Sequence, residues 1–261
     1  MTTGVGAPGR AQIEARTLRT DRWWASPAAT FAFLLVMVVY LTWAIFVNKD
    51  YFWEPYISPM YSPCLTGNCA PGSGWGWFGS IAPVTPALII IVFPMGFRVT
   101  CYYYRKAYYR SFWASPPACA VPEPHKKYTG ERRFPLIMQN LHRYFFYAVL
   151  LISILNTWDV IQAFRGPNGS FGLGLGTLIM LVNVVLLWSY ALSCHSCRHI
   201  TGGRLKNFSK HPVRYWAWTQ VSRLNAKHMQ LAWTTLGTLM LTDLYIWLLA
   251  AGVFNDPRIF N

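Results

Sequence analysis

The sequence predicts an all-α membrane protein, a bundle of five transmembrane helices with a cytoplasmic N-terminus and a C-terminus on the outside. Of its 261 residues, 54% are hydrophobic and only 12% are charged, about half the charged share of an ordinary soluble domain. Five apolar runs are long enough, or nearly so, to cross a hydrocarbon core of roughly 30 Å. They predict spans at about 28–47, 82–104, 140–164, 171–197 and 227–254.

The basic residues predict the orientation of these spans. The formal net charge is +14, and with the N-terminus inside, 20 of the 23 Lys and Arg residues fall on the inside. This is a strong positive-inside signal, so we expect a multi-pass protein of the plasma (inner) membrane. No zinc finger or RNP motif is present, so nucleic acid is not an expected partner. The three outside basic residues are Lys49, Arg165 and Arg258.

The connections between spans have distinct compositions. Residues 49–81 form an outside loop rich in Pro, Gly and aromatics, which suits a cap at the level of the lipid headgroups. Within it, Cys64 and Cys69 could close a disulfide on the oxidising side, with free thiols as the alternative. Residues 105–135 and 200–226 are expected to be cytoplasmic loops. The polar N-terminal segment lacks a cleavage site, so the first helix is expected to remain as an anchor.

All six histidines fall in predicted cytoplasmic loops or at cytoplasmic helix ends. Three different spans bring imidazoles to one depth, and two cysteines lie at that depth too. A cluster of His and Cys from several helices of a bundle predicts a metal or cofactor site, whereas interfacial polar caps are the simpler alternative. The residues are His142 at the start of the third span, Cys194, His195, Cys197 and His199 at the end of the fourth, and His228 at the start of the fifth.

Residues 193–199 limit the cofactors and redox motifs that this site could represent. Their sequence is Ser-Cys-His-Ser-Cys-Arg-His. Covalent c-type haem needs C-x-x-C-H, but Arg198 follows the second cysteine. A thioredoxin-like C-x-x-C needs a βαβ context, which this chain does not offer. A zinc ion bound by such residues stays open as an alternative.

Helical geometry separates the candidate ligands into two pairs. On a regular helix Cys194 and Cys197 share one face, while His195 and His199 share another. The simplest four-ligand set therefore joins the two cysteines to histidines of the neighbouring helices, giving two thiolates and two imidazoles. That is the ligand inventory of a Rieske-type 2Fe-2S centre. The predicted ligands are His142, Cys194, Cys197 and His228, with His195 and His199 as alternates.

These motifs resemble the cytochrome b-type membrane anchor of actinobacterial succinate dehydrogenases, the single-chain, five-helix kind. The resemblance rests on Leu141-His142-Arg143-Tyr144, on the stretch 193–199, and on Leu224-Asn225-Ala226-Lys227-His228-Met229. It covers nearly the whole chain, from Arg19 to Tyr245.

The resemblance implies a quinone-binding subunit of succinate:quinone oxidoreductase. A flavoprotein subunit would oxidise succinate and an iron-sulfur subunit would pass electrons to this chain on its cytoplasmic side. The actinobacterial group implies a membrane-embedded Rieske-type 2Fe-2S cluster. Other anchors of the wider family bind b haems through histidine pairs, and since no histidine lies outside, the alternative is a single haem b near the inside face. A higher oligomer of the complex stays open.

A quinone pocket is expected near the inside face, with aromatic walls and a few donors for the two carbonyl oxygens. The indole groups have an alternative role as membrane-belt residues, and the arginine as an orientation charge. The candidates are Arg22, Trp23, Trp24, Tyr144 and His199.

Two carboxylates, Asp159 and Asp243, fall within or near apolar spans. They lie roughly 22–25 Å along the helix axis from His142 and His228, and so towards the outside. An ionisable group in a span predicts a functional role, here a proton route. Interfacial carboxylates held by neighbouring Thr or Trp donors are the alternative.

Two other function classes remain open, a cofactor-free anchor that only docks partners and a small transporter with a zinc or proton site. A transporter usually shows inverted repeats, broken central helices and midplane charges. This chain shows none clearly, and its polar cluster lies at one face. The redox anchor is therefore the favoured interpretation, with membrane lipid, quinone and the soluble subunits as partners.

Overall fold

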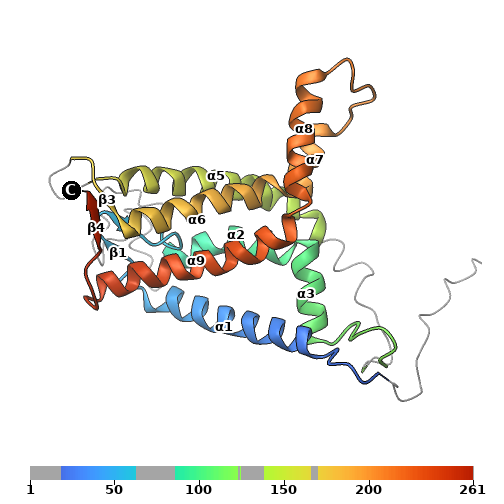
Figure 1. The fold of residues 1–261 in the computed structure, drawn as a ribbon, viewed down its shortest axis with the longest axis horizontal. Helices are drawn as coiled ribbons and strands as arrows, with labels where there is room; N and C mark the ends of the chain where they lie inside the picture. Colours follow the sequence, from blue (N-terminus) through green and yellow to red (C-terminus); the bar gives the residue numbers. More distant parts are fainter. Residues whose placement is uncertain (1–18, 63–85, 123, 125–137, 166–169, 261) are drawn as a thin grey trace, which may run out of the picture. The chain divides into compact units, whose positions relative to one another are not determined.

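The computed structural model describes residues 19–62, 86–122, 124, 138–165 and 170–260, and this part of the chain is mostly helical (Figure 1). The helices are α1 (Ala25–Val47), α2 (Pro86–Val99), α3 (Tyr102–Phe112), α5 (His142–Gln162), α6 (Leu175–Leu192), α7 (His195–Gly202), α8 (Pro212–Asn225) and α9 (His228–Ala250). The strands are β1 (Phe52–Trp53), β2 (Tyr56–Ile57), β3 (Leu173–Gly174) and β4 (Arg258–Phe260).

The chain divides into two compact units, and the first comprises the described residues of Met1–Val38 and Thr100–Asn140. It contains the beginning of α1 and all of α3. Inside this unit the rings of Phe31 and Phe112 lie 4.8 Å apart, and Arg19 Nη1 donates to the carbonyl of Cys119 at 2.8 Å.

The second unit, Val39–Val99 with Leu141–Asn261, contains the helix bundle. In it α6 packs against both α5 and α9, while α2 packs against α5 (Figure 1). Their buried contact surfaces are apolar, as at Val160, Val184 and Ile246. Many of the outward side chains are large and apolar as well, which is the pattern of helices that face lipid rather than water.

Three described helical stretches are long and apolar enough to cross a membrane, namely Ala25–Val47, Met138–Gln162 and Leu175–Leu192. The pair α2 and α3 would make a fourth span if the two helices count as one broken span. α9 has 23 residues but includes His228, Asp243 and several threonines, which lower its mean hydropathy. The described helices therefore support a membrane protein with three or four candidate spans.

The prediction of one regular helix through 193–199 is wrong. α6 ends at Leu192, and α7 begins at His195 as a separate helix. Cys194 is the N-cap of α7, with extended dihedrals (φ −66°, ψ 146°), and its Sγ accepts the backbone N–H of Ser196 at 3.3 Å. A capped helix start of this kind redirects the chain, so the cysteines and histidines of this motif do not follow one continuous helical face.

The predicted loop 200–226 contains the helix α8, and α7 and α8 lie across the direction of the bundle helices (Figure 1). Arg214 of α8 donates to the carbonyls of Thr201 and Gly203 at the end of α7, at 2.8 and 2.9 Å. The ring of Trp218 lies against Gly202. Likewise, the predicted loop 105–135 begins inside α3.

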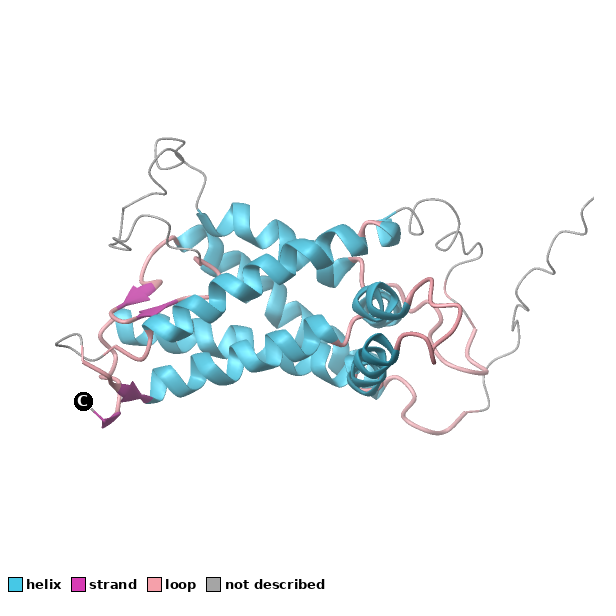
Figure 2. Cartoon of the chain, turned by 90° about the horizontal axis from the view of Figure 1, so that it is seen from above, coloured by secondary structure: helices cyan, strands magenta, loops and turns pink. Residues whose placement is uncertain are grey.

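Buried carboxylates accept hydrogen bonds at the end of the second unit that is opposite α7 and α8. The short strands lie at this end (Figure 2). β1 pairs antiparallel with β2, and β3 with β4. Asp256 accepts hydrogen bonds from Tyr56, Tyr245 and the backbone N–H of Gly176, at 2.6 to 2.8 Å. This end, which contains Asp159, Asp243 and Asp256, is called the carboxylate end below.

Adding a methyl group at Gly202 should disturb the α7–α8 packing. A Cβ there would lie 2.1 Å from Cδ1 of Trp218, so Gly202→Ala must push the indole away. We expect a loss of about 1–3 kcal/mol in the stability of this helix pair. Thermal unfolding of the detergent-solubilised protein measures it. Gly237→Ala is the matched control, because a Cβ at Gly237 meets nothing within 4 Å; equal behaviour of the two variants would contradict the packing argument.

Candidate functional site

His142 and Cys194 lie in direct contact at the end of the second unit away from the carboxylates. The distance from His142 Nε2 to Cys194 Sγ is 3.1 Å, and Cys194 is fully buried. The imidazole of His142 is also hydrogen-bonded to the backbone of Phe97. Its ring stacks on the ring of Phe97, with the centroids 4.5 Å apart. Several neighbours therefore hold this imidazole with Nε2 facing the thiol.

The orientation and tautomer of His228 follow from its contact with Ser193. Ser193 Oγ lies 2.7 Å from His228 Nδ1 and donates its proton to the carbonyl of Tyr190, also at 2.7 Å. A hydroxyl has one proton, so Ser193 must accept a hydrogen bond from Nδ1–H. The lone pair of His228 is then on Nε2. The side chain is 2% exposed, and its ring stacks on Tyr190 at 5.1 Å.

Cys197 and His195, two further candidate ligands in the stretch 193–199, have different environments. Cys197 lies one turn into α7 and is 8% exposed. α7 lies beyond the end of the candidate span α6, and burial raises the pKa of the Cys197 thiol above its usual value, so the thiol is protonated at neutral pH. His195 is exposed but close enough to His142 and His228 to interact with them electrostatically.

The name histidine–cysteine cluster is used below for the four predicted ligands His142, Cys194, Cys197 and His228. The structure brings the first two into contact and buries both cysteines and His228 at the same end of the bundle. Among the described residues, no group of three or more His, Cys, Asp or Glu side chains has metal-binding geometry. The alternate His199 is directed elsewhere, since its Nδ1 accepts a hydrogen bond from Arg143.

Several residues that support the cluster have no clear signal in the sequence. Ser193 stands beside Cys194, but only the fold shows that it holds His228. Asn225 Nδ2 donates to the Ser193 carbonyl at 2.7 Å, which fixes the backbone at the helix break. Phe97 and Tyr190 are two of many aromatic residues, and stacking partners from different helices follow only from the packing.

The predicted quinone-binding residues are distributed over both units. Arg22, Trp23 and Trp24 belong to the first unit, where Trp24 is 56% exposed. Tyr144 and His199 belong to the second unit, where Tyr144 is 69% exposed. All five lie at or near the surface of their own unit, which is where a ligand from the lipid phase would approach.

Asp159 and Asp243 are buried at the carboxylate end, with 8% and 4% exposed. Asp243 accepts a hydrogen bond from Tyr40 at 2.6 Å and another from Ser58, and Asp159 accepts one from Ser62. The donors are therefore Ser and Tyr side chains rather than the expected Thr or Trp. A proton route through these carboxylates stays a prediction. The predicted disulfide of Cys64 and Cys69 lies outside the described residues.

Comparison with known proteins identifies the family. Residues 25–252 match the family model of the actinobacterial succinate dehydrogenase subunit SdhC. The chain is also similar to a chain of the solved Mycobacterium smegmatis Sdh1 complex in the apo form. The two are 58% identical, with a TM-score of 0.84, over 99% of this chain and 100% of that one.

A search of curated proteins found no match. The family match covers the helices that carry His142, Cys194 and His228, and the similarity to the solved chain extends over nearly the whole fold. This chain therefore belongs to the actinobacterial SdhC family, the membrane-anchor subunits of succinate dehydrogenase.

Proposed function

We propose that this subunit relays electrons from a soluble iron-sulfur subunit to quinone through a Rieske-type 2Fe-2S cluster held by His142, Cys194, Cys197 and His228. The family supports the anchor role, and the chain is a subunit of an oxidoreductase whose succinate site is on another chain. Such a cluster carries one electron at a time. Quinone takes up two electrons and two protons to become quinol.

The observation that carries the proposal is one imidazole held against a buried thiol, with a second buried and oriented imidazole at the same end of the bundle. His142 directs Nε2 to Cys194 Sγ, and His228 donates Nδ1–H to Ser193, which leaves Nε2 with the lone pair. Histidines that bind metals typically donate a hydrogen bond from the N–H of their second ring nitrogen in this way. Two cysteines and two histidines are the donor set of a Rieske-type centre.

The protein environment suits a site that must exclude water. Cys194 and His228 are almost completely buried, and Phe97 and Tyr190 cover the two imidazoles. Because the Cys197 thiol is protonated when free, binding of a metal there would release its proton. The four side chains would hold the iron, and the aromatic rings would keep solvent from it.

The family and the basic composition support a cytoplasmic docking face for flavoprotein and iron-sulfur subunits. The exposed region from α7 to the start of α9 contains Arg204, Lys206, Lys210, Arg223 and Lys227, which suit an acidic protein surface. In this arrangement α9 is a full span, the helix count is five, and the histidine–cysteine cluster lies at the cytoplasmic side. Quinone would contact Arg22, Trp23, Trp24, Tyr144 and His199.

Spectroscopy of the purified complex tests the cofactor directly. After dithionite reduction we expect a Rieske-type EPR signal without a b-haem absorption band, because the His142 imidazole lies against the Cys194 thiol. Acid-labile sulfide and haem should be measured against protein. A b-type spectrum with no additional iron-sulfur signal would instead assign the histidines to a single haem b and overturn the cluster.

Replacing one cysteine separates electron relay from succinate oxidation. Cys197→Ser should abolish quinone reduction while the dehydrogenase activity of the soluble subunits with an artificial electron acceptor persists, because serine is a poor ligand for iron in such clusters. Cys119→Ser is the control, since Cys119 is an exposed free thiol in the other unit. Normal quinone reduction by Cys197→Ser would refute the assigned role.

The hydrogen bond from His228 to Ser193 predicts a graded effect. Ser193→Ala removes the group that fixes the His228 tautomer, and loss of such a support typically lowers metal affinity about 10- to 100-fold. The iron and acid-labile sulfide retained after dialysis against a chelator measures this. Ser189→Ala, one turn earlier, should retain the full content, because among the described residues the Ser189 hydroxyl bonds to a carbonyl of its own helix. Equal retention in both variants would remove Ser193 from the site.

A further inference from the structure

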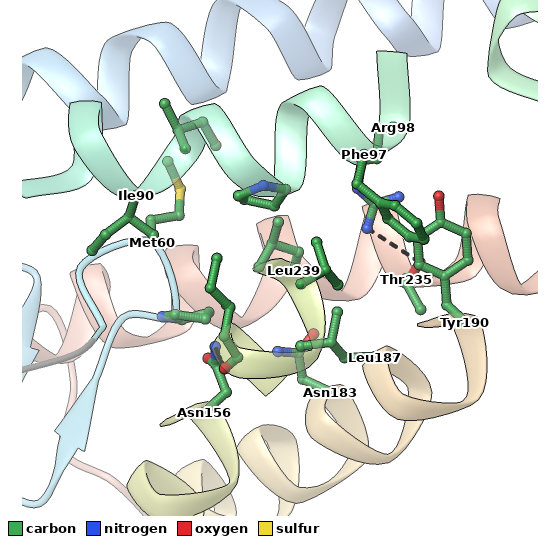
Figure 3. Close-up of a pocket in the computed structure, with 15 residues that line it drawn as sticks. Met60, Ile90, Phe97, Arg98, Asn156, Asn183, Leu187, Tyr190, Thr235 and Leu239 are labelled. Carbon is green, nitrogen blue, oxygen red and sulfur yellow. Dashed lines mark hydrogen bonds between the residues drawn. The ribbon is translucent and has the colours of Figure 1, made fainter. Parts of the chain in front are cut away.

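A cavity lies inside the second unit between α2, α5, α6 and α9 (Figure 3). Its volume is about 40 Å³, and most of its wall is apolar. Five polar side chains also line it, and they come from all four helices: Arg98, Asn156, Asn183, Tyr190 and Thr235. The cavity extends from Met60 near the carboxylate end to Arg98 and Tyr190 near the histidine–cysteine cluster.

Two asparagines have hydrogen-bonding capacity that the described protein does not use. Asn183 is 5% exposed, and its side-chain amide has no hydrogen-bond partner among the described residues. Asn156 is 6% exposed and donates from Nδ2 to the carbonyl of Ile152 at 2.9 Å, but its side-chain oxygen accepts nothing from the described residues. A buried amide without a partner is unfavourable, so these groups point to a polar occupant.

The wall formed by α2 contains a proline. Pro94 lies inside α2 and lines the cavity. Proline has no N–H, so the carbonyl of Ile90, four residues earlier and at the same cavity, loses its helical hydrogen bond. In a membrane helix such a freed carbonyl is commonly satisfied by a neighbouring side chain or by ordered water.

We propose that this cavity is a water-binding site inside the bilayer, with Asn183 and Asn156 as its principal anchors. One bound water needs roughly 10–15 Å³ of such space and two to four polar partners, so the cavity holds about three waters. Purely apolar cavities of this size stay dry, whereas the asparagine amides supply the polar partners that bound water needs.

The water site has a defined relation to the histidine–cysteine cluster. Arg98 donates to the carbonyl of Ala232 and to Thr235 Oγ1, at 3.1 and 3.2 Å, and its guanidinium lies 4.9 Å from the centre of the Tyr190 ring. The ring of Tyr190 in turn stacks on His228. The waters therefore lie one aromatic ring away from the cluster. The proposal does not depend on which cofactor the cluster binds.

X-ray radiolysis of the intact complex tests the site, because hydroxyl radicals formed from bound water oxidise adjacent side chains. Met60 lines the cavity, whereas Met180 packs in the apolar core at Val184, and the two are similarly buried at 3% and 5% exposure. We expect Met60 to be oxidised about five-fold faster than Met180, as quantified by mass spectrometry. Equal rates in the native complex would overturn the proposal.

Variants on α6 identify the anchor. Asn183→Leu keeps a side chain of similar size but removes the amide, so Met60 oxidation should fall to the Met180 rate. Val182→Leu, on the adjacent lipid-facing position with 54% exposure, should leave it unchanged. If Met60 is still oxidised rapidly in a folded Asn183→Leu variant, Asn183 is not the anchor. In a high-resolution map of the native complex, discrete water peaks would support the site and a planar ligand would refute it.

Discussion

The need to satisfy every polar group inside the bundle governs this structure. In a bilayer no bulk solvent reaches a buried hydroxyl, amide or carboxylate, so each needs a partner in the protein or a bound water. At the carboxylate end, Asp243 accepts a hydrogen bond from Tyr40 of α1. Asp256 accepts hydrogen bonds from Tyr56, between α1 and α2, and from Tyr245 of α9. At the other end, His228 is paired through Ser193. Between the two ends, the polar side chains of Asn156, Asn183 and Thr235 line the cavity.

The need to pair buried polar groups also explains the helix break at the end of the bundle that contains the histidine–cysteine cluster. A continuous helix through residues 193–199 would bury its own hydrogen bonds but would carry the cysteines away along the axis. Two polar backbone groups at the break find hydrogen-bond partners nearby. The Cys194 thiol accepts the backbone N–H of Ser196, and the Ser193 carbonyl accepts a hydrogen bond from Asn225. The chain can therefore turn at a point inside the packed helices. It places one cysteine against α5 while α7 leaves across the bundle.

Hydropathy and charge were enough to predict a helical membrane protein, and the His and Cys motifs were enough to predict that His142 and Cys194 lie at the same end of the bundle. His142 and Cys194, 52 residues apart, do lie in contact. The break between α6 and α7 was not predictable, because residues 193–199 include no Gly or Pro and a cysteine is not a usual N-cap. Nor were Ser193 and Phe97 identifiable as supports of the imidazoles, since their role depends on contacts between helices. The helix α8 was missed because none of its residues is buried.

The pairing of β3 with β4 bears on the order in which the protein is assembled. Residues 256–260 are synthesised after all the described helices, yet Asp256 binds the first turn of α6 and β4 pairs with the segment that precedes it. When α6 is synthesised, its partners Asp256 and β4 have not yet been made. The carboxylate end can close only after α9 has been made. Insertion of α6 and formation of its contacts with Asp256 and β4 are therefore separate events in biogenesis.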